Sequence, residues 1–272
     1  SPVFDSEPLE AELEILGAPV AELELTVNRP VAQVAVRLSD VRPDGEVTRV
    51  SYGLLNLTHR DSHEEPEALE PGERYRVAVQ LNDIAQRFPA GHRIRLALST
   101  SYWPLAWPPP WPVTMRVFTG ASELVLPTRP ARAEDSDLPA VADPAGAPLP
   151  ELTTIEPPDF SWRILRELEA NSFTLEVHDT EGVYRVEHVG TEVEYRGVEH
   201  YTIIDNDFRS PRGRVQRVMG FRRGDWDVRT VTETELTADP ENFYIRATLD
   251  AYEDGESVYH QDWDLAIPRD HV

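Results

Sequence analysis

The sequence FPAGHRIRLAL, residues 88–98, places a turn directly before a strand. Its first four residues include a proline, which fixes φ, and a glycine, which accepts positive φ, and this combination is typical of a tight turn. Ile94, Leu96 and Leu98 then alternate with polar or small residues, so one face of the extended chain is apolar. The stretch therefore predicts a strand that turns one face to a hydrophobic core.

The same alternation recurs on both sides of this stretch. It is clearest in the apolar positions Leu23, Leu25, Val27, Val34, Val36, Leu38, Tyr75, Val77, Val79 and Leu81. Turn signals at 42–45 and 70–72 separate these runs. Several short strands at this spacing predict a β-sandwich or jelly roll over residues 1–128. Within it, residues 82–88 are expected to form one short helical turn capped by Asn82 or Asp83.

The chain changes character after residue 128. Residues 129–158 are rich in Pro, Ala, Asp and Glu without a periodic apolar face, which predicts an extended linker. Residues 159–272 alternate again, for example at Phe243, Ile245, Ala247 and Leu249, and their tight turns favour a twisted antiparallel sheet that curls into a half-barrel or a sandwich. Only residues 162–168 are ambiguous between helix and strand. We expect an all-β protein whose sandwich is followed by a second antiparallel β domain.

Composition narrows the classes of function. The 272 residues include 49 acids and 26 basic residues, all of them arginine, for a net charge of −23. This negative net charge opposes binding to nucleic acid or to anionic membranes. No stretch of the sequence approaches the roughly 20 apolar residues that span a bilayer. The absence of cysteine excludes disulfides, thiolate zinc sites and a cysteine nucleophile, and it is compatible with the cytoplasmic location that we expect. Without an initiator Met or a signal peptide, the chain is expected to be a piece of a longer protein.

The sequence lacks the motifs that build an activated nucleophile. There is no G-x-S-x-G elbow, Walker loop, H-E-x-x-H or dinucleotide glycine fingerprint. Ser99, Ser101 and Ser122 are available hydroxyls, but none lies in a strand–turn–helix setting, and a hydroxyl without its base is inert. We therefore predict no catalytic residue in this chain.

Two groups of residues resemble metal sites only superficially. His59 and His63 are four residues apart, but their surroundings predict a solvated loop rather than a helix. Asp205-Asn206-Asp207 looks like the start of an oxygen-ligand loop for calcium, yet it lacks the later Gly and Glu of an EF-hand. The carboxylates of residues 159–272 are interpreted as solvated strand faces rather than as a glycosidase pair or a calcium site. We predict no metal and no cofactor.

The most unusual segment is SYWPLAWPPPWP, residues 101–112, in which Trp103, Trp107 and Trp111 are interleaved with proline. A stiff loop loses little entropy on binding, and each Trp offers a large contact surface. Exposed aromatic clusters usually mark interfaces, so we favour a contact with another domain. The alternatives are a loop folded over its own sandwich and a platform that stacks on sugars.

At this point the order of segments resembles a known family. Leu38-Ser39-Asp40-Val41-Arg42-Pro43-Asp44-Gly45 is similar to the strand and turn L-x-D-V-x-P-D-G of the X-Pro dipeptidyl-peptidase C-terminal domain. Residues 51–56 resemble the strand that follows in the family. Residues 88–96 resemble its F-x-x-G-H-R-I-R-L signature, and the Ser-rich strand end at 99–101 follows in the family's order. The resemblance covers about residues 5–128.

The resemblance implies a jelly-roll, galactose-binding-like domain that follows an α/β-hydrolase domain in enzymes of the cocaine-esterase (CocE/NonD) type. The hydrolase domain carries the family's Ser-Asp-His triad and lies outside these 272 residues, so no catalytic residue carries over. The expected function is a non-catalytic accessory region of a serine hydrolase, which packs on that α/β-hydrolase domain and shapes its active site. The alternatives are an independent carbohydrate-binding β module and, more weakly, a calcium-dependent β module. Residues 159–272 extend beyond the family domain.

Overall fold

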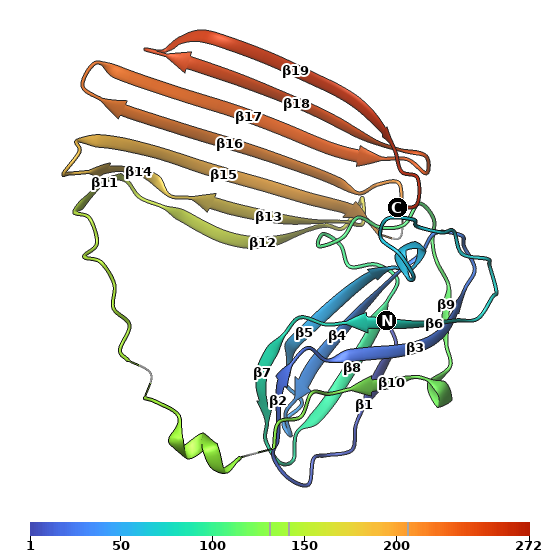
Figure 1. Ribbon diagram of the computed structural model, residues 1–272. Coiled ribbons are helices and arrows are strands. Elements are labelled where there is room, and N and C mark those ends of the chain that lie inside the picture. The colour runs from blue at the N-terminus through green and yellow to red at the C-terminus, as the bar shows by residue number, and fades with distance from the viewer. Residues whose placement is uncertain (131, 141, 206) are drawn as a thin grey trace. The chain divides into compact units, whose positions relative to one another are not determined.

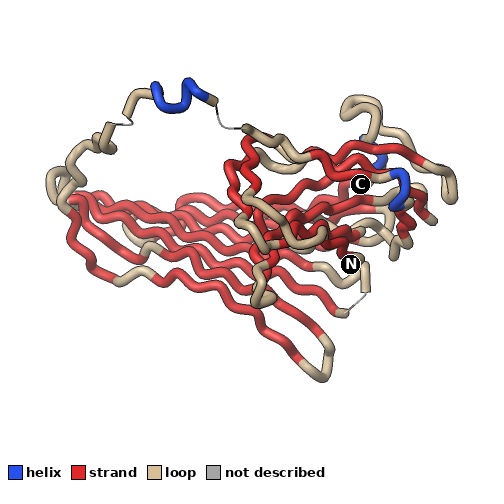
Figure 2. The backbone as a smooth tube through the Cα atoms, turned by 90° about the horizontal axis from the view of Figure 1, so that it is seen from below, coloured by secondary structure: helices blue, strands red, loops and turns tan. Residues whose placement is uncertain are grey.

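The computed structural model describes residues 1–130, 132–140, 142–205 and 207–272. The chain divides into two compact units, which are residues 1–142 with 271–272, and residues 143–270. Almost all regular structure is strand, as Figure 2 shows, and this confirms the predicted all-β class. In the described residues, no helix is long and apolar enough to cross a membrane.

The first unit is a sandwich of antiparallel strands. Its strands are β1 (Val3–Asp5), β2 (Leu13–Gly17), β3 (Val20–Val27), β4 (Gln33–Val41), β5 (Val47–Asn56), β6 (Tyr75–Gln80), β7 (Ile84–Phe88), β8 (Arg93–Ser99), β9 (Met115–Val117) and β10 (Glu123–Val125). One sheet has the order β1-β8-β4-β5, and the other has the order β10-β3-β6 with β9 also paired to β3. A separate pair, β2-β7, completes the unit (Figure 1). Three short 3-10 helices, η1 (Leu57–His59), η2 (Thr119–Ala121) and η3 (Ala133–Asp137), lie in the connections.

The core of the first unit consists of the alternating apolar positions that the sequence predicts. Along β3 every second residue is buried, and the same rows of β4, β6 and β8 complete one hydrophobic cluster. Leu25, Val36 and Leu98 are among the side chains with no exposed surface. Fully burying such a side chain contributes about 1.5–3 kcal/mol, so this cluster stabilises the unit.

His271, near the C-terminal end of the chain, is part of the first unit, and its backbone carbonyl oxygen is a hydrogen-bond acceptor there. It accepts hydrogen bonds from Asn56 Nδ2 at 2.7 Å and from Thr58 Oγ1 at 2.9 Å. Thr58 is buried, and its hydroxyl also lies 3.0 Å from Asn56 Oδ1, so it has two acceptors for its proton.

The second unit is a single nine-stranded antiparallel sheet. Its strands are β11 (Leu152–Glu156), β12 (Asp159–Glu167), β13 (Ser172–Thr180), β14 (Gly182–Val186), β15 (Thr191–Ile204), β16 (Arg212–Arg223), β17 (Trp226–Ala238), β18 (Asn242–Glu253) and β19 (Glu256–Pro268). The order is β11-β14-β15-β16-β17-β18-β19, and β13 pairs with both β12 and β15. Strands β15 to β19 run side by side as a meander (Figure 1). The turn between β18 and β19 contains Asp254 and Gly255 at φ values of 53° and 82°, where glycine is favoured.

Three segments differ from, or resolve, the expectations drawn from the sequence. Residues 84–88 form strand β7 rather than a helical turn, because Phe88 is fully buried in the core and the segment pairs with β2. Residues 162–168, ambiguous in the sequence, lie in strand β12 up to Glu167. Strand β11 lies within the range 129–158, so the sheet of the second unit begins before the sequence alternation becomes visible.

Candidate functional site

The Trp-Pro loop, residues 101–112, is anchored on the outer face of the first unit's own sheet. Arg49 of β5 donates from Nη1 to the hydroxyl of Tyr102 at 2.6 Å, and Gln33 of β4 donates from Nε2 to the carbonyl of Trp107 at 3.4 Å. Within the loop, the amide of Ala106 donates to the carbonyl of Tyr102 at 3.0 Å. These bonds hold the loop in one conformation before it meets any partner.

Aromatic and cationic groups pack around the base of this loop. The Tyr102 ring lies edge to face with that of Tyr52, with centroids 5.7 Å apart, and the guanidinium of Arg37 lies 5.5 Å from the Tyr102 centroid. Cation–π and edge-to-face contacts of this kind are each worth about 0.5–1.5 kcal/mol. They add to the rigidity of the loop.

The three tryptophans of the loop are half-buried rather than fully presented to solvent. Trp103 and Trp107 lie edge to face, with centroids 5.0 Å apart and planes at 86°. Trp111 is half-buried as well, whereas Leu105 at the tip is 54% exposed. Two perpendicular rings do not form the flat platform that stacks on a sugar face. The loop is therefore a preformed surface projection with mostly apolar side chains.

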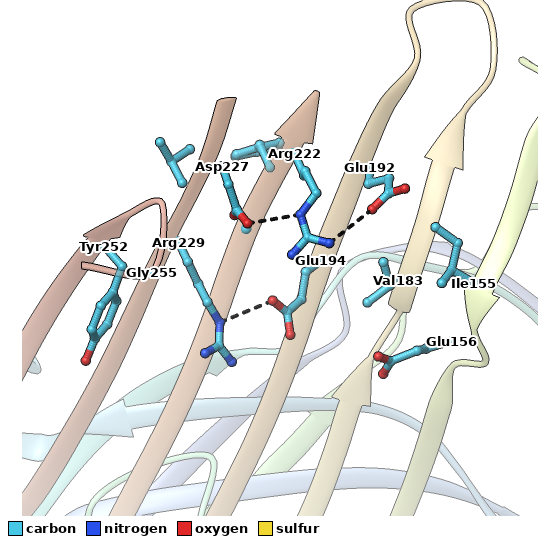
Figure 3. Close-up of a pocket in the computed structure, with 13 residues that line it drawn as sticks. Ile155, Glu156, Val183, Glu192, Glu194, Arg222, Asp227, Arg229, Tyr252 and Gly255 are labelled. Atoms are coloured by element: carbon cyan, nitrogen blue, oxygen red, sulfur yellow. Dashed lines mark hydrogen bonds and ion pairs between the residues drawn. The ribbon is translucent and has the colours of Figure 1, made fainter. Parts of the chain in front are cut away.

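A charged hollow lies on the sheet of the second unit. Its volume is about 500 Å³, and Figure 3 shows the side chains on its floor. Arg222 bridges Asp227 at 3.0 Å and Glu192 at 3.7 Å, and Arg229 pairs with Glu194 at 3.2 Å. These residues come from β15, β16 and β17, whose register places them on one face.

Further arginines complete the pairing around this hollow. Arg196 contacts both Glu156 and Glu194, and Arg185 contacts Glu192. Hydrogen bonds to these carboxylates raise the pKa of Arg196 and of Arg185 above its ordinary value. Each carboxylate on the floor thus faces an arginine, which is the arrangement of a salt-bridged strand surface rather than of an acid–base pair. Sequence reasoning missed this hollow because its residues come from strands whose register no local pattern specifies.

A second hollow, of about 360 Å³, opens at the edge of the sandwich in the first unit. Apolar side chains of β3 and β8 line it, and Asp5 of β1 lies at its rim. Arg95 donates to both oxygens of Asp5 at 2.7 Å, and this bond holds the pKa of Asp5 below its ordinary value. The ion pair joins the edge strand β1 to β8.

Two of the three hydroxyls considered from the sequence, those of Ser99 and Ser122, donate to backbone carbonyls. Ser99 donates to the carbonyl of Ser101 at 2.9 Å, and Ser122 donates to the carbonyl of Phe118 at 2.9 Å. Across the described ranges, no serine hydroxyl hydrogen-bonds to a histidine. His92 instead pairs with Asp40, with Nδ1 at 2.8 Å from the carboxylate.

The two histidines spaced four residues apart do meet. His59 Nδ1 and His63 Nδ1 lie 3.4 Å apart, His59 at the end of η1 and His63 in an exposed loop. Within the described part of the chain, no group of three or more His, Asp or Glu is arranged to hold a metal ion. The candidate calcium loop at 205–207 includes Asn206, which lies outside the described residues.

Comparison with known proteins gives one family. Residues 1–134 match the X-Pro dipeptidyl-peptidase C-terminal non-catalytic domain. The cocaine esterase of Rhodococcus sp. (strain MB1 Bresler) is 29% identical over 101 residues, which cover 37% of this chain and 18% of that protein. The chain thus spans less than a fifth of the length of this curated relative.

Two solved structures are similar to the chain over about half of its length. An α-amino acid ester hydrolase aligns with a TM-score of 0.45 and 25% identity, over 47% of this chain and 25% of that one. An aminopeptidase from a marine sediment archaeon, Thaumarchaeota archaeon, aligns with a TM-score of 0.43 and 23% identity, over 46% of this chain and 24% of that one.

Proposed function

We propose that this chain serves as the accessory region of a serine hydrolase. The premise is that residues 1–134 are an X-Pro dipeptidyl-peptidase C-terminal non-catalytic domain. In this proposal an α/β-hydrolase domain of the same polypeptide performs the chemistry, and the sandwich packs on it and shapes the surroundings of its active site. The observation that carries the proposal is the family match over the whole sandwich. The relatives that share it include an esterase.

The Trp-Pro loop is the surface that we assign to this contact. Trp103, Trp107 and Trp111 supply its aromatic area, and the exposed Leu105 forms its tip. The anchoring bonds from Arg49 and Gln33 fix the loop in advance, so little conformational entropy is lost when a partner covers it. Interfaces are commonly centred on such aromatic anchors.

The first experiment tests catalysis by the chain alone. The purified 272-residue chain is assayed with p-nitrophenyl acyl esters, with and without a serine-directed inhibitor such as phenylmethanesulfonyl fluoride. We expect no turnover above the rate of the buffer, because the hydroxyls of Ser99 and Ser122 are bound to carbonyls rather than to a base. Turnover that the inhibitor abolishes would contradict the proposal.

The second experiment tests the loop in the full-length gene product, whose reading frame we expect to encode a G-x-S-x-G hydrolase domain. Leu105→Arg places a charge in the proposed contact, and Val47→Arg makes the same change at an apolar side chain of similar exposure elsewhere in the sandwich. Loss of a contact worth about 2 kcal/mol lowers the melting temperature by roughly 4–8 °C in a unit of this size. We expect Leu105→Arg to show this loss together with reduced kcat/KM, and Val47→Arg to show neither. Equal effects, or a reading frame without the hydrolase domain, would refute the assignment.

A further inference from the structure

The two faces of the nine-stranded sheet differ sharply in chemistry. Successive residues of a strand point to opposite faces, and the register of the pairs carries each row across the sheet. The face that contains Trp263 of β19, here called the apolar face, holds these large hydrophobic side chains at exposures of 37–78%: Leu152, Phe160, Trp162, Ile164, Phe173, Met219, Trp226, Tyr259, Trp263, Leu265 and Ile267. On the opposite face, which contains the charged hollow, Ile155, Leu165 and Ile204 are comparably exposed among the described strand residues. Val258, at the irregularity in the pairing of β18 with β19, is exposed as well.

Charge divides the two faces in the same way. In the described strands, the apolar face carries three arginines and four acids, which are Arg166, Arg217, Arg223, Asp179, Glu199, Glu253 and Glu256. The opposite face carries the dense network of ion pairs that includes Arg222–Asp227 and Arg229–Glu194. With one more acid than arginines, the apolar face is therefore nearly neutral within a chain whose net charge is −23.

An apolar sheet face left in water is costly. Each large side chain that stays exposed forgoes about 1.5–3 kcal/mol of burial energy, and contiguous apolar patches above a few hundred Å² mark interaction surfaces. Sheets with one apolar face are normally covered by a second layer.

We propose that this apolar face is the interface of a symmetric dimer, in which two copies of the chain stack their sheets face to face as a β-sandwich. The partner is a second copy because the face is nearly neutral, whereas the chain as a whole is strongly anionic. Two copies that meet elsewhere bring many like charges together, and two copies that meet here bring together few. In a two-fold arrangement the same patch serves both partners.

The size of the face suits such a dimer. Strands β15 to β19 have 14, 12, 13, 12 and 13 residues. At about 3.3 Å per residue and about 4.8 Å between strands, they form a surface of roughly 40 by 24 Å. This is about 960 Å², and a stable interface needs about 800 Å² from each partner.

The relief of the face is self-complementary as well. Strands β17 and β18 carry small side chains on this face, such as Thr230, Thr232 and Ala247, while the edge strand β19 carries Trp263 and Leu265. Stacked sheets lie about 10 Å apart and interdigitate best when large residues meet small ones. The edge strand of one copy can therefore pack against the small side chains of β17 and β18 of the other.

The first test measures the mass of the full 272-residue chain by sedimentation equilibrium from about 1 to 100 µM, a range that brackets micromolar affinities. We expect a dimer. Leu265→Arg on the apolar face is expected to weaken dimerisation at least 30-fold, since a buried unpaired charge at a packed position costs more than 2 kcal/mol. The matched control is Ala266→Arg, the same charge on the next residue of β19, which faces the other way and should leave the dimer intact.

Cross-linking gives an independent readout that does not depend on a destabilising change. Because the chain has no cysteine, Thr232→Cys at the middle of β17 introduces one thiol near the expected two-fold axis. A bismaleimide that spans about 10 Å should link two copies there. Thr248→Cys, on the opposite face of β18, should not cross-link.

Three outcomes would overturn the proposal. They are a monomer at every concentration, a dimer that Leu265→Arg leaves intact, and cross-linking through Thr248→Cys rather than Thr232→Cys. If the wild-type chain is a monomer that binds the dye ANS and the Leu265→Arg variant does not bind it, the apolar face has an occupant other than a second copy of the chain.

Discussion

At the scale of single residues, one polar cluster stands out on the apolar face. Tyr201 donates from its hydroxyl to Glu199 Oε2 at 2.6 Å, and Arg217 forms an ion pair with the other carboxylate oxygen. Gly197 lies opposite Arg217, and a Cβ there would come within 2.5 Å of the Arg217 Nη1 atom. Glu199 and Arg217 pair with each other, so this cluster can be covered without leaving either of these two charges unpaired.

The environment shifts the ionisation of two members of this cluster. Burial acts to raise the pKa of Glu199, but hydrogen bonds from Tyr201 and Arg217 outweigh it and hold the pKa below its ordinary value. Burial, followed by the hydrogen bond to Glu199, raises the pKa of Tyr201 to about 12. The folded chain therefore favours the neutral tyrosine.

This shift predicts a pH dependence of stability. An unfolded tyrosine ionises near pH 10, whereas folded Tyr201 resists ionisation up to about pH 12. The stabilisation from neutral Tyr201 is therefore complete below pH 10 and is lost as the pH rises from 10 to 12. We expect the free energy of unfolding in urea to fall less steeply over this range in Tyr201→Phe than in the wild type. Tyr259→Phe, at an exposed position on the same face, is the control, and identical slopes in Tyr201→Phe and wild type would contradict the assignment.

At the scale of elements, the sandwich depends on a close approach between β5 and the end of β6. Gly53 of β5 lies so near this strand that a Cβ would be 2.4 Å from the carbonyl oxygen of Gln80 and 3.2 Å from the Cα of Leu81. Both contacts are with backbone, which cannot rotate away as a side chain does. Glycine is therefore required here by space rather than by an unusual φ.

Gly53→Ala is expected to destabilise the first unit. Forcing a methyl group against backbone in a packed region costs about 1–3 kcal/mol, which lowers the melting temperature by several degrees. Differential scanning calorimetry of the full chain measures this shift. Gly120→Ala, where a Cβ would meet nothing within 4 Å, should leave the melting temperature unchanged, and equal melting temperatures for both variants would show that β5 can move away.

Single elements also show which structural features can be predicted from local sequence patterns. The alternation of β3 predicts its buried row correctly, because a strand with one buried face has period two wherever it lies. The segment 84–88 does not form the expected helical turn, because pairing with β2 and burial of Phe88 outweigh a local capping signal. The Trp-Pro loop is unusual already in its composition, but the perpendicular arrangement of Trp103 and Trp107 depends on the folded loop.

At the scale of the whole molecule, the two units differ in how they bury apolar surface. The first encloses a continuous hydrophobic cluster between sheets. In the second, the buried apolar side chains among the described residues are Val177, Pro211 and Ala238. Residues 142–150 between the compact regions are exposed throughout and form no strand.

This organisation predicts the first site of proteolysis. Exposed backbone without sheet hydrogen bonds is cut most readily. We expect proteinase K at low ratio to cleave first within residues 142–150 and to leave a resistant fragment that begins near residue 1. Mass spectrometry of the early fragments identifies the site. A first cut inside β15 to β19 would show that the single sheet opens more easily than the connecting segment.

Alternation, turn residues and motif order were enough to predict the all-β class, the apolar rows that form the core of the sandwich and the family that the first half of the chain resembles. Alternation and turn chemistry are local, so they survive without knowledge of which strands are neighbours. Three features became visible only in the folded chain: residues 152–268 form one layer, most of its exposed large side chains share one face, and acids and arginines from separate strands meet in the charged hollow. These features depend on the order and register of strands, which are fixed by long-range pairing across the whole sheet.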